Sequence, residues 1–256
     1  MIIDIEKFDI FEGMTSISAV IKSIRDNSSD RVIDTVYFDK SRAAKKSHEL
    51  KFLEHASIDL GFKLTDADTE FIDSMVSGNT HGGFVMLCLK RSFPNLDVNF
   101  LTNGNFYALI EGIEDPYNFG YSVRSLYAAG IDGIVLPERN WMEFSSTVAR
   151  SSAGTSELAN IAISDPFDAV NLFKNNGFEI VCAGIRDSVS LCDYDFSKPT
   201  LLVIGGEKRG ISRRILDVSD VTVRIPYGRD FMGSLPSASA VSVMAFEISG
   251  KKNKLR

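Results

Sequence analysis

Residues 106–130, FYALIEGIEDPYNFGYSVRSLYAAG, pass from an apolar run through a proline-containing turn into a segment of helical pattern. The run Tyr107–Ile110 is continuous, which is typical of a strand buried on both faces of a parallel sheet. The helix that follows extends to Ala129. Gly130 ends the helix because glycine readily adopts the left-handed conformation of a C-terminal cap. This stretch therefore predicts one strand–loop–helix unit of an α/β fold.

Further apolar runs alternate with helical stretches in the rest of the chain. They lie at Gly133–Leu136, Glu179–Ala183 and Leu201–Ile204. Such alternation predicts a mostly parallel sheet with helices on both of its faces. Ligands of open parallel sheets bind outside the carboxyl ends of the strands, so the loops after these runs are the first candidates for a site.

The residues before this sheet predict a second, smaller α/β unit. Helical spacing appears around Ile17–Ile24, over Lys40–Leu60, and over Asp66–Met75 with Thr65 as the N-cap, while strands are expected at Val32–Phe38, Phe62–Leu64 and Phe84–Lys90. Turn-forming Pro94, Gly104 and three asparagines between residues 93 and 105 indicate a linker. We therefore expect an N-terminal domain over 1–92, a linker over 93–105 and a larger domain over 106–256.

Composition excludes several classes of protein. The chain has 256 residues, of which 44% are hydrophobic and 24% charged, as in an ordinary globular protein, and no apolar run is long enough to span a membrane. The acidic N-terminal stretch does not resemble a secretion signal, so we expect a cytoplasmic protein. Three cysteines without a CxxC pair predict free thiols, and three histidines without ligand spacing argue against a zinc or histidine-based hydrolytic site; these residues are Cys88, Cys182, Cys192, His48, His55 and His81.

The charge pattern leaves one candidate surface for nucleic acid. A net charge of −6 argues against nonspecific wrapping of nucleic acid, which depends on Lys and Arg meeting phosphates. A local basic patch nevertheless lies within a dozen residues, opposed only by Glu49; it consists of Lys40, Arg42, Lys45, Lys46 and Lys51. Such a run is either an RNA phosphate contact or a solvated helix face.

Three loops combine residue types that can carry chemistry, although each also has a plain structural interpretation. In the first, at Glu111–Gly130, Asn118 could simply cap a helix and Arg124 could form a surface ion pair. The second, VIGGEKRG at Val203–Gly210, has glycines that let backbone N–H groups approach a ligand, or it is only a strand-to-helix turn. The third, SLPSASAVSVMAFE at Ser234–Glu247, opens a helix of small residues that indicates close packing.

Taken in order and with their spacing, these loops resemble the three motifs of the SpoU (TrmH-like) RNA ribose 2′-O-methyltransferases. Asp115-Pro116-x-Asn118-x-Gly120-x3-Arg124 resembles the first motif, Gly206-Glu207 with Gly210 the second, and Ser234-Leu235 before the small-residue helix the third. The segment Arg150–Gly154 also looks like that family. The N-terminal half, which ends in HGGFV at 81–85, is similar to the ribosomal-protein-like RNA-binding domain of many members.

The resemblance implies a trefoil knot in the C-terminal part, a homodimer, S-adenosylmethionine as cofactor, and an rRNA or tRNA substrate. The residues themselves predict no metal and no membrane. It assigns catalysis to Asn118, Arg124 and Ser234, and cofactor binding to three loops that contain Ile204, Gly205, Gly206, Glu207, Gly210, Ile225, Pro226, Leu235 and Pro236. RNA contacts are expected from the basic patch. Glu207 is expected to hold the glycine loop through backbone N–H groups.

Two questions follow from the residues. Arg124 is either a base or a phosphate anchor, and the anchor role is favoured because a guanidinium stays protonated in proteins. Pro236 stands where the family's third motif usually has Asn, so a side-chain amide is replaced by a ring without an N–H. A methyltransferase is therefore expected, with a non-catalytic RNA-binding or assembly protein of the same fold as the alternative.

Overall fold

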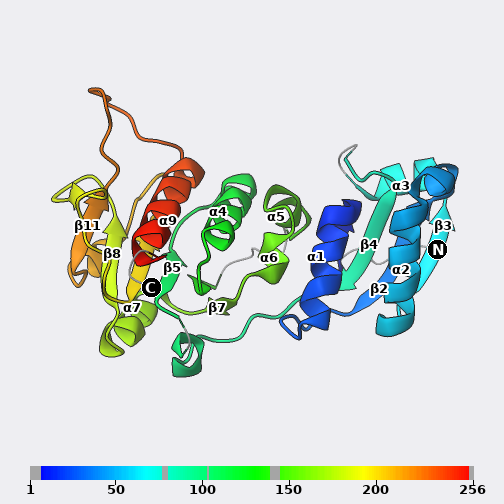
Figure 1. Ribbon diagram of the computed structural model, residues 1–256, viewed down its shortest axis with the longest axis horizontal. Helices are drawn as coiled ribbons and strands as arrows, with labels where there is room; N and C mark the ends of the chain where they lie inside the picture. The colour runs from blue at the N-terminus through cyan, green and yellow to red at the C-terminus, as the bar shows by residue number, and fades with distance from the viewer. Residues whose placement is uncertain (1–6, 77–79, 103, 139–144, 254–256) are drawn as a thin grey trace. The chain divides into compact units, whose positions relative to one another are not determined.

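The computed structural model describes residues 7–76, 80–102, 104–138 and 145–253, which form two compact units (Figure 1). The first unit comprises residues 1–92 and 140–158, and the second comprises 93–139 and 159–256. The chain thus passes from one unit to the other three times. This division places residues 140–158 with the N-terminal unit, whereas the sequence pattern assigned them to the larger domain. Residues 93–102, expected as a linker, belong to the second unit, where Asn95 pairs with Ile163.

The first unit is built on a four-stranded sheet in the order β1-β4-β2-β3. Its strands are β1 (Phe8–Glu12), β2 (Ile33–Asp39), β3 (Lys63–Ala67) and β4 (Phe84–Leu89), and its helices include α1 (Gly13–Arg25), α2 (Ser47–Leu60) and α3 (Thr69–Met75). Strand β4 pairs antiparallel with both β1 and β2, while β2 and β3 are parallel. The buried core joins apolar residues of α1, such as Ile17 and Val20, to Leu53 of α2 and Met86 of β4.

Two local predictions in this unit are wrong. The helix expected over 40–60 is divided into a 3-10 helix, η2 (Lys40–Lys46), and α2, because Asp39 caps η2 by accepting the Ser41 N–H and a new helix starts at Ser47. The N-cap of α3 is Asp68 and not Thr65, since Thr65 is paired with Tyr37 inside β3.

A later segment of the chain completes the first unit. Helices α5 (Ser145–Ser151) and α6 (Thr155–Leu158) contribute Ala149 to its core and a buried carboxylate, Glu157, to an ion-pair network. Arg31 donates from Nε and Nη2 to Glu157, and from Nη1 to Asp9 at 2.7 Å. All three side chains are at most 5% exposed. Breaking a buried pair on one side leaves an uncompensated charge, so this network fastens α6 to the N-terminal unit.

The second unit contains a seven-stranded sheet in the order β7-β6-β5-β10-β8-β11-β9, in which every neighbouring pair is parallel. Its strands are β5 (Phe106–Ile110), β6 (Gly133–Leu136), β7 (Ile161–Ile163), β8 (Glu179–Ala183), β9 (Val189–Ser190), β10 (Thr200–Ile204) and β11 (Val221–Arg224). The fully buried β5 and β10 are adjacent at the centre, with Val203 opposite Leu109. The predicted α/β architecture with a mostly parallel sheet is therefore confirmed.

Helices flank this sheet. Tyr107 and Leu109 of β5 pack toward α7 (Pro166–Asn175) and α8 (Arg213–Leu216), in one cluster with Phe173 and Ile215. Alternate strand residues face the opposite side of the sheet. Helices α4 (Pro116–Ala128) and α9 (Ser237–Asn253) lie side by side (Figure 1), and the Ser125 and Ser242 hydroxyls are 2.6 Å apart. Among the described residues, no helix has the length and apolar character needed to cross a membrane.

Candidate functional site

The first loop is shaped by the capping of α4. The Asp115 carboxylate accepts the Asn118 N–H at 2.8 Å, and Pro116 occupies the first turn, where its missing N–H costs nothing. Asn118 is thus three residues after the cap and is not the N-cap itself, so the structural interpretation from sequence is wrong. Its side-chain amide remains available for other contacts. Gly130, with φ of +82°, follows the end of this helix as predicted.

The second loop is a tight turn after β10. Gly206 and Gly210 bond to each other in both directions, with N···O distances of 3.2 and 2.9 Å. A Cβ on Gly206 would lie 2.2 Å from the carbonyl oxygen of Gly112, and a Cβ on Gly205 would lie 2.3 Å from the carbonyl carbon of Gly210. Glycine is therefore required here by the close approach of two backbones. Ile204, at the end of the strand, is buried.

The Glu207 carboxylate brings the three loops together. Its Oε1 accepts a hydrogen bond from Asn118 Nδ2 at 2.6 Å and another from Ser237 Oγ at 3.1 Å. Asn118 belongs to the first loop and Ser237 to the third, so residues far apart in sequence meet at one oxygen. The Glu207 carboxylate thus contacts side chains of the first and third loops. The backbone N–H contacts expected for it from sequence are not present among the described residues.

The third loop leads into α9. The Pro236 carbonyl accepts the Ala240 N–H at 3.0 Å, so Pro236 stands directly before the helix, and its ring is exposed. Leu235 donates its backbone N–H to the Tyr227 hydroxyl at 3.1 Å. This contact ties the start of the loop, just after β11, to its end.

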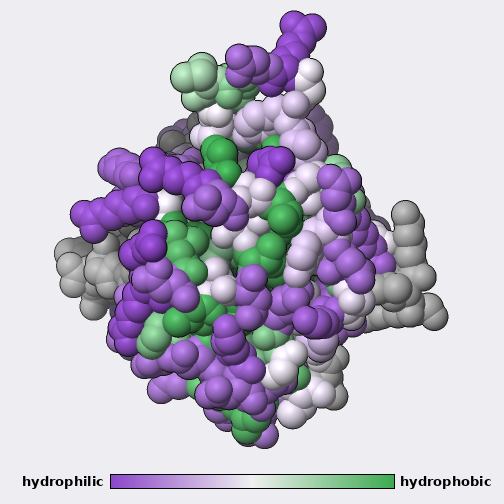
Figure 2. Space-filling view, turned by 90° about the vertical axis from the view of Figure 1, so that its left-hand side faces the viewer, coloured by the Kyte–Doolittle hydropathy of each residue, from purple (hydrophilic) through white to green (hydrophobic). Residues whose placement is uncertain are grey.

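Two cavities lie at the carboxyl ends of the strands. The β8–β11 cavity, of about 480 Å³, is lined by Ala183–Ile185 at the end of β8 and by most residues from Arg224 to Leu235, with Ala240 and Met244 of α9. It contains four predicted residues: Ile225, Pro226, Ser234 and Leu235. Figure 2 shows the side of the molecule where β8 and β11 lie in Figure 1, with hydrophobic side chains gathered at its centre among hydrophilic ones.

The glycine-loop cavity is separate and more polar. It is lined by Glu111, Gly112 and Glu114 after β5 and by residues 206–210 and Ser212 after β10. Gly206, Glu207 and Gly210 of the predicted cofactor set therefore lie here, and not in the β8–β11 cavity. Glu111 supports this wall because its Oε2 accepts the Ser212 N–H at 2.9 Å.

Arg124 is exposed on α4 and makes no hydrogen bond or ion pair with any residue that the structure describes. Its guanidinium is thus available to an anionic ligand. Tyr121 and Tyr117, about one and two turns earlier on the same helix, are 47% and 45% exposed. This helix surface therefore presents a cation beside two aromatic rings.

The sequence analysis missed several residues that line these cavities. Gly184 and Ile185 follow β8 directly and form one wall of the β8–β11 cavity, and Ser237 bonds to Glu207. A usable signal existed, because the predicted strand Glu179–Ala183 ends where ligands of parallel sheets bind. The end of this strand lines the cavity because β8 lies between β10 and β11, and apolar runs in the sequence do not reveal the order of strands in the sheet.

The remaining candidates are structural. His81 is buried, accepts the Gly83 N–H and contacts Asp73. Burial raises the pKa of Cys182 to about 11, so this thiol stays protonated at neutral pH, whereas Cys192 is exposed. All three cysteines are free, as predicted. In the part of the chain that the structure describes, no cluster of His, Cys, Asp or Glu could hold a metal ion.

The basic patch is partly neutralised. Lys40 pairs with Asp68 at 2.6 Å, Arg42 with Asp39 at 3.1 Å and Lys46 with Glu49 at 2.7 Å. Lys45 and Lys51 are exposed and make no ion pair with a described residue. Two of the five predicted RNA contacts therefore retain an uncompensated charge.

The similar proteins of known sequence are named as tRNA/rRNA methyltransferases. A protein of Staphylococcus saprophyticus named as a TrmH family tRNA/rRNA methyltransferase is 30% identical over 146 residues, which are 57% of this chain and 58% of that protein. A tRNA/rRNA methyltransferase of Borreliella burgdorferi is 28% identical over 227 residues, covering 82% of this chain and 97% of the relative.

Solved structures share the fold. The AdoMet-bound rRNA methyltransferase from Sinorhizobium meliloti has a TM-score of 0.76 at 21% identity, covering 96% of this chain and 88% of that chain. The SpoU methyltransferase AviRb from Streptomyces viridochromogenes, in complex with AdoMet, has a TM-score of 0.76 at 20% identity, covering 97% and 91%. The profile of the SpoU rRNA methylase family matches residues 105–246, more than half of the chain, including the first two loops and the third as far as Phe246. The chain belongs to the SpoU rRNA methylase family.

Proposed function

We propose that this protein transfers a methyl group from S-adenosylmethionine to a ribose 2′-hydroxyl of structured RNA, either rRNA or tRNA. The observation that carries the proposal is the Glu207 carboxylate, which joins Asn118 and Ser237 and so assembles the three family motifs at one edge of the parallel sheet. A relative in fold named as an RNA 2′-O ribose methyltransferase, with a TM-score of 0.77 at 15% identity, supports the same acceptor.

The β8–β11 cavity fits the cofactor. Its apolar side chains, including Ile225 and Leu235, suit an adenine ring, and its polar groups, including Arg229 and Asp230, suit an amino acid moiety. S-adenosylmethionine supplies a methyl group bonded to a positively charged sulfur. We assign cofactor contacts to Ile225, Pro226 and Leu235 in this cavity, with Ile204–Gly206, Glu207, Gly210 and Pro236 in the adjoining loops. A trefoil knot formed by these loops is part of the same proposal.

The reaction forms a bond from the ribose oxygen to the methyl carbon while the carbon–sulfur bond breaks, which leaves neutral S-adenosylhomocysteine, and the 2′ proton passes to solvent water. Catalysis therefore depends on alignment of the two reactants. We assign Arg124 to a phosphate next to the target ribose, since a permanently protonated guanidinium binds phosphate through charge-assisted hydrogen bonds. We also assign Asn118 and Ser234 to hydrogen bonds with the ribose or the cofactor.

The direct test is methyl transfer. Purified protein, radiolabelled S-adenosylmethionine and RNA from a strain lacking the gene should give labelled RNA, with the product mapped as a 2′-O-methylated nucleotide. Methylation on a base instead of a ribose would reject the ribose assignment while keeping a methyltransferase. Absence of both cofactor binding and transfer would favour the alternative, a non-catalytic RNA-binding protein.

The non-catalytic alternative rests on Pro236, which stands where the third motif of the family usually has Asn. Because Pro236 is exposed directly before α9, replacing it with the family's usual Asn should be tolerated by the fold. If a side-chain amide at this position helps to orient the reactants, Pro236→Asn should raise the transfer rate without changing the affinity for RNA. Cofactor affinity, measured by calorimetry for both proteins, separates an effect on binding from one on transfer.

We also propose that the N-terminal unit binds RNA through the basic patch. Lys45 and Lys51 carry the uncompensated charge, so replacing both with Ala should weaken RNA binding across sequences and reduce the log–log salt slope by about two units. Replacing Lys40, which is paired with Asp68, should reduce the slope less. Equal salt slopes for the parent protein, the Lys45 and Lys51 double variant and the Lys40 variant would show that the patch is only a solvated helix face.

A further inference from the structure

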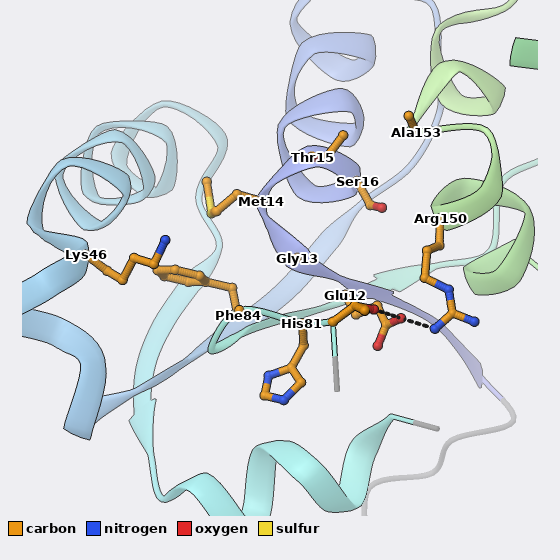
Figure 3. A pocket seen from close by; sticks show the side chains of 12 residues that line it. Glu12, Gly13, Met14, Thr15, Ser16, Lys46, His81, Phe84, Arg150 and Ala153 are labelled. Atoms are coloured by element: carbon orange, nitrogen blue, oxygen red, sulfur yellow. Dashed lines mark hydrogen bonds and ion pairs between the residues drawn. The ribbon is translucent and has the colours of Figure 1, made fainter. Parts of the chain in front are cut away.

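The N-terminal unit contains a cavity of about 260 Å³ at the start of α1, which neither the proposed transfer reaction nor the basic patch explains. Figure 3 shows Lys46 and Arg150 on opposite sides of it, with Glu12 and Gly13 between them. Met14 and Phe84 contribute apolar surface. We call this the Glu12 cavity. All of its lining residues belong to the first unit.

Glu12 has an unused acceptor. Its side chain is 5% exposed, and its Oε1 accepts hydrogen bonds from Arg150 and from Thr80 Oγ1, the latter at 3.3 Å. Its Oε2 is buried and accepts no hydrogen bond from any residue that the structure describes. A buried carboxylate oxygen without a donor is costly, since it has lost water and gained nothing in exchange. This oxygen has almost no accessible surface, so a ligand N–H group must displace the atoms that cover it before it can bind there and remove that cost.

The start of α1 adds donors beside this acceptor. Glu12 is the N-cap residue, yet its side chain makes no capping hydrogen bond, and the first turn contains no acidic residue. The N–H groups of the first turn therefore keep their partial positive charge. The Lys46 and Arg150 side chains are 38% and 32% exposed at the rim, although each already pairs with one carboxylate, Glu49 or Glu12. The cavity thus offers donors for an anion and an acceptor for an N–H group.

A nucleotide has this combination of groups. Its phosphates accept from cations and from helix N-termini, its base has apolar faces, and adenine, cytosine and guanine carry an exocyclic amino group that a carboxylate can accept from. Uracil lacks the amino group, and its two carbonyl oxygens flank its only N–H, so they would face the carboxylate. Proteins that recognise single-stranded RNA bind unstacked bases in this way.

We propose that the Glu12 cavity binds one unstacked nucleotide of the substrate RNA, whose base donates an amino proton to Glu12 Oε2. The proposal rests on the proposed function, because RNA is the expected substrate. It adds a base-selective contact in the N-terminal unit, distinct from the sequence-independent phosphate contacts of Lys45 and Lys51.

The first experiment uses mononucleotides and the full-length protein. AMP, CMP, GMP and UMP are titrated separately while the amide NMR signals of residues 13–16 are followed. At least one amino-bearing nucleotide should shift these signals saturably at millimolar concentration, and UMP should bind at least fivefold more weakly. No saturable shift with any nucleotide, or equal binding of UMP, would overturn the proposal.

Variants locate the effect. Glu12→Gln keeps the size of the side chain and removes its charge, and should abolish the preference over UMP. Because Glu12 is paired with Arg150, a second variant leaves this pair intact: Thr15 is exposed on the rim, and Thr15→Trp should block the cavity. The matched control is His55→Trp, at an exposed position of α2 outside the lining, which should bind nucleotides like the parent protein.

A second readout separates this inference from the proposed function. If the wild-type protein methylates no RNA, the proposed function fails regardless of the result of the nucleotide titrations. If it does methylate RNA, Thr15→Trp should lower kcat/KM for RNA at least tenfold and leave the affinity for S-adenosylmethionine unchanged. Normal kcat/KM in both Thr15→Trp and Glu12→Gln would reject a nucleotide site in this cavity while leaving the methyltransferase intact.

Discussion

At the scale of single residues, the Glu207 carboxylate and the Arg124 guanidinium have opposite surroundings. Glu207 accepts two side-chain hydrogen bonds and holds the loops together. Arg124 is exposed and has no partner among the described residues. A side chain that is fixed by its neighbours is suited to positioning, whereas an exposed and unpaired cation is suited to binding an external anion.

Arg124→Ala is therefore expected to reduce turnover far more than RNA affinity. One phosphate contact beside the reacting ribose is a small part of total binding, but its loss in the transition state should lower kcat by about 100-fold. Single-turnover methylation and RNA affinity measured on the same protein provide the comparison. The control is Arg213→Ala, whose side chain is 86% exposed in an ion pair with Asp217, and which should leave both quantities unchanged. A parallel loss of RNA affinity in Arg124→Ala would contradict the anchor role.

At the scale of elements, the site depends on the close approach of two strand ends. The loops after β5 and β10 meet where Gly112 faces Gly206, because these two central strands are paired in register from Phe106 to Ile110. The register brings equivalent loop positions together, and the absence of side chains lets the backbones touch.

Gly206→Ala should destabilise the protein by about 2 kcal/mol or more, since its Cβ would lie 2.2 Å from the Gly112 carbonyl oxygen and backbone would have to move. Gly250→Ala is the matched control. Gly250 is exposed near the end of α9, with nothing within 4 Å of an added Cβ, so alanine there should stabilise the helix by roughly 0.5–1 kcal/mol. Urea unfolding of both variants gives the two signs, and an unaffected Gly206→Ala protein would show that the loop can move apart.

A second element-scale prediction concerns the cap of η2. Burial by itself raises the pKa of Asp39, but hydrogen bonds from Ser41 and Thr69 and the charge of Arg42 outweigh burial and hold the pKa below its ordinary value of 3.8. The ionised carboxylate therefore stabilises the fold above pH 3.8, and this contribution is lost as the pH falls through the lower folded-state pKa.

Asp39→Asn should accordingly cost about 1–3 kcal/mol at pH 7, and the difference from the parent protein should shrink below pH 3.8. Urea unfolding at several pH values measures both effects. Asp59→Asn, which breaks an exposed pair with Arg25 in the same unit, should change stability by less than about 1 kcal/mol. A pH-independent loss in Asp39→Asn would assign the stabilisation to packing and not to charge.

The accuracy of the sequence predictions follows the range of the interactions involved. The runs that became β6 and β8 were predicted with their full bounds, because continuous apolar residues report burial directly. The short β7 and β9 were not predicted, since three and two residues carry too little pattern. β11 has the same length as β6, but only Val223 of its four residues is buried, so it lacks a continuous apolar run. The contact of Asn118 with Glu207 joins residues 89 positions apart and depends on strand order, which local periodicity does not contain. The roles of the predicted site residues stay predictions.

At the scale of the whole molecule, the second unit has an exposed aromatic and aliphatic surface on two adjacent helices. Tyr117 and Tyr121 of α4 are 45% and 47% exposed, and Val243 and Phe246 of α9 are 44% and 55% exposed. Exposed apolar side chains gathered on neighbouring helices are typical of an interface. We propose this surface as the contact of the homodimer that the family resemblance implies.

Phe246→Glu should convert the dimer to a monomer at micromolar concentration, because a charge would be buried without a partner. Light scattering measures the mass directly. Met232→Glu serves as control, since Met232 is 99% exposed in the loop before α9 and lies outside this surface. A monomeric parent protein, or a Phe246→Glu protein that remains dimeric, would exclude this interface.

The late position of α5 and α6 in the sequence also constrains the order in which the chain can fold during its synthesis. When residue 92 has been made, the first unit still lacks Ala149 in its core and Glu157 beside Arg31. Of the two carboxylates that pair with Arg31 in the folded unit, only Asp9 has then been synthesised. The first unit is completed only after β5, α4 and β6 have left the ribosome, so the strands of the second unit's sheet begin to form while the first unit is still incomplete.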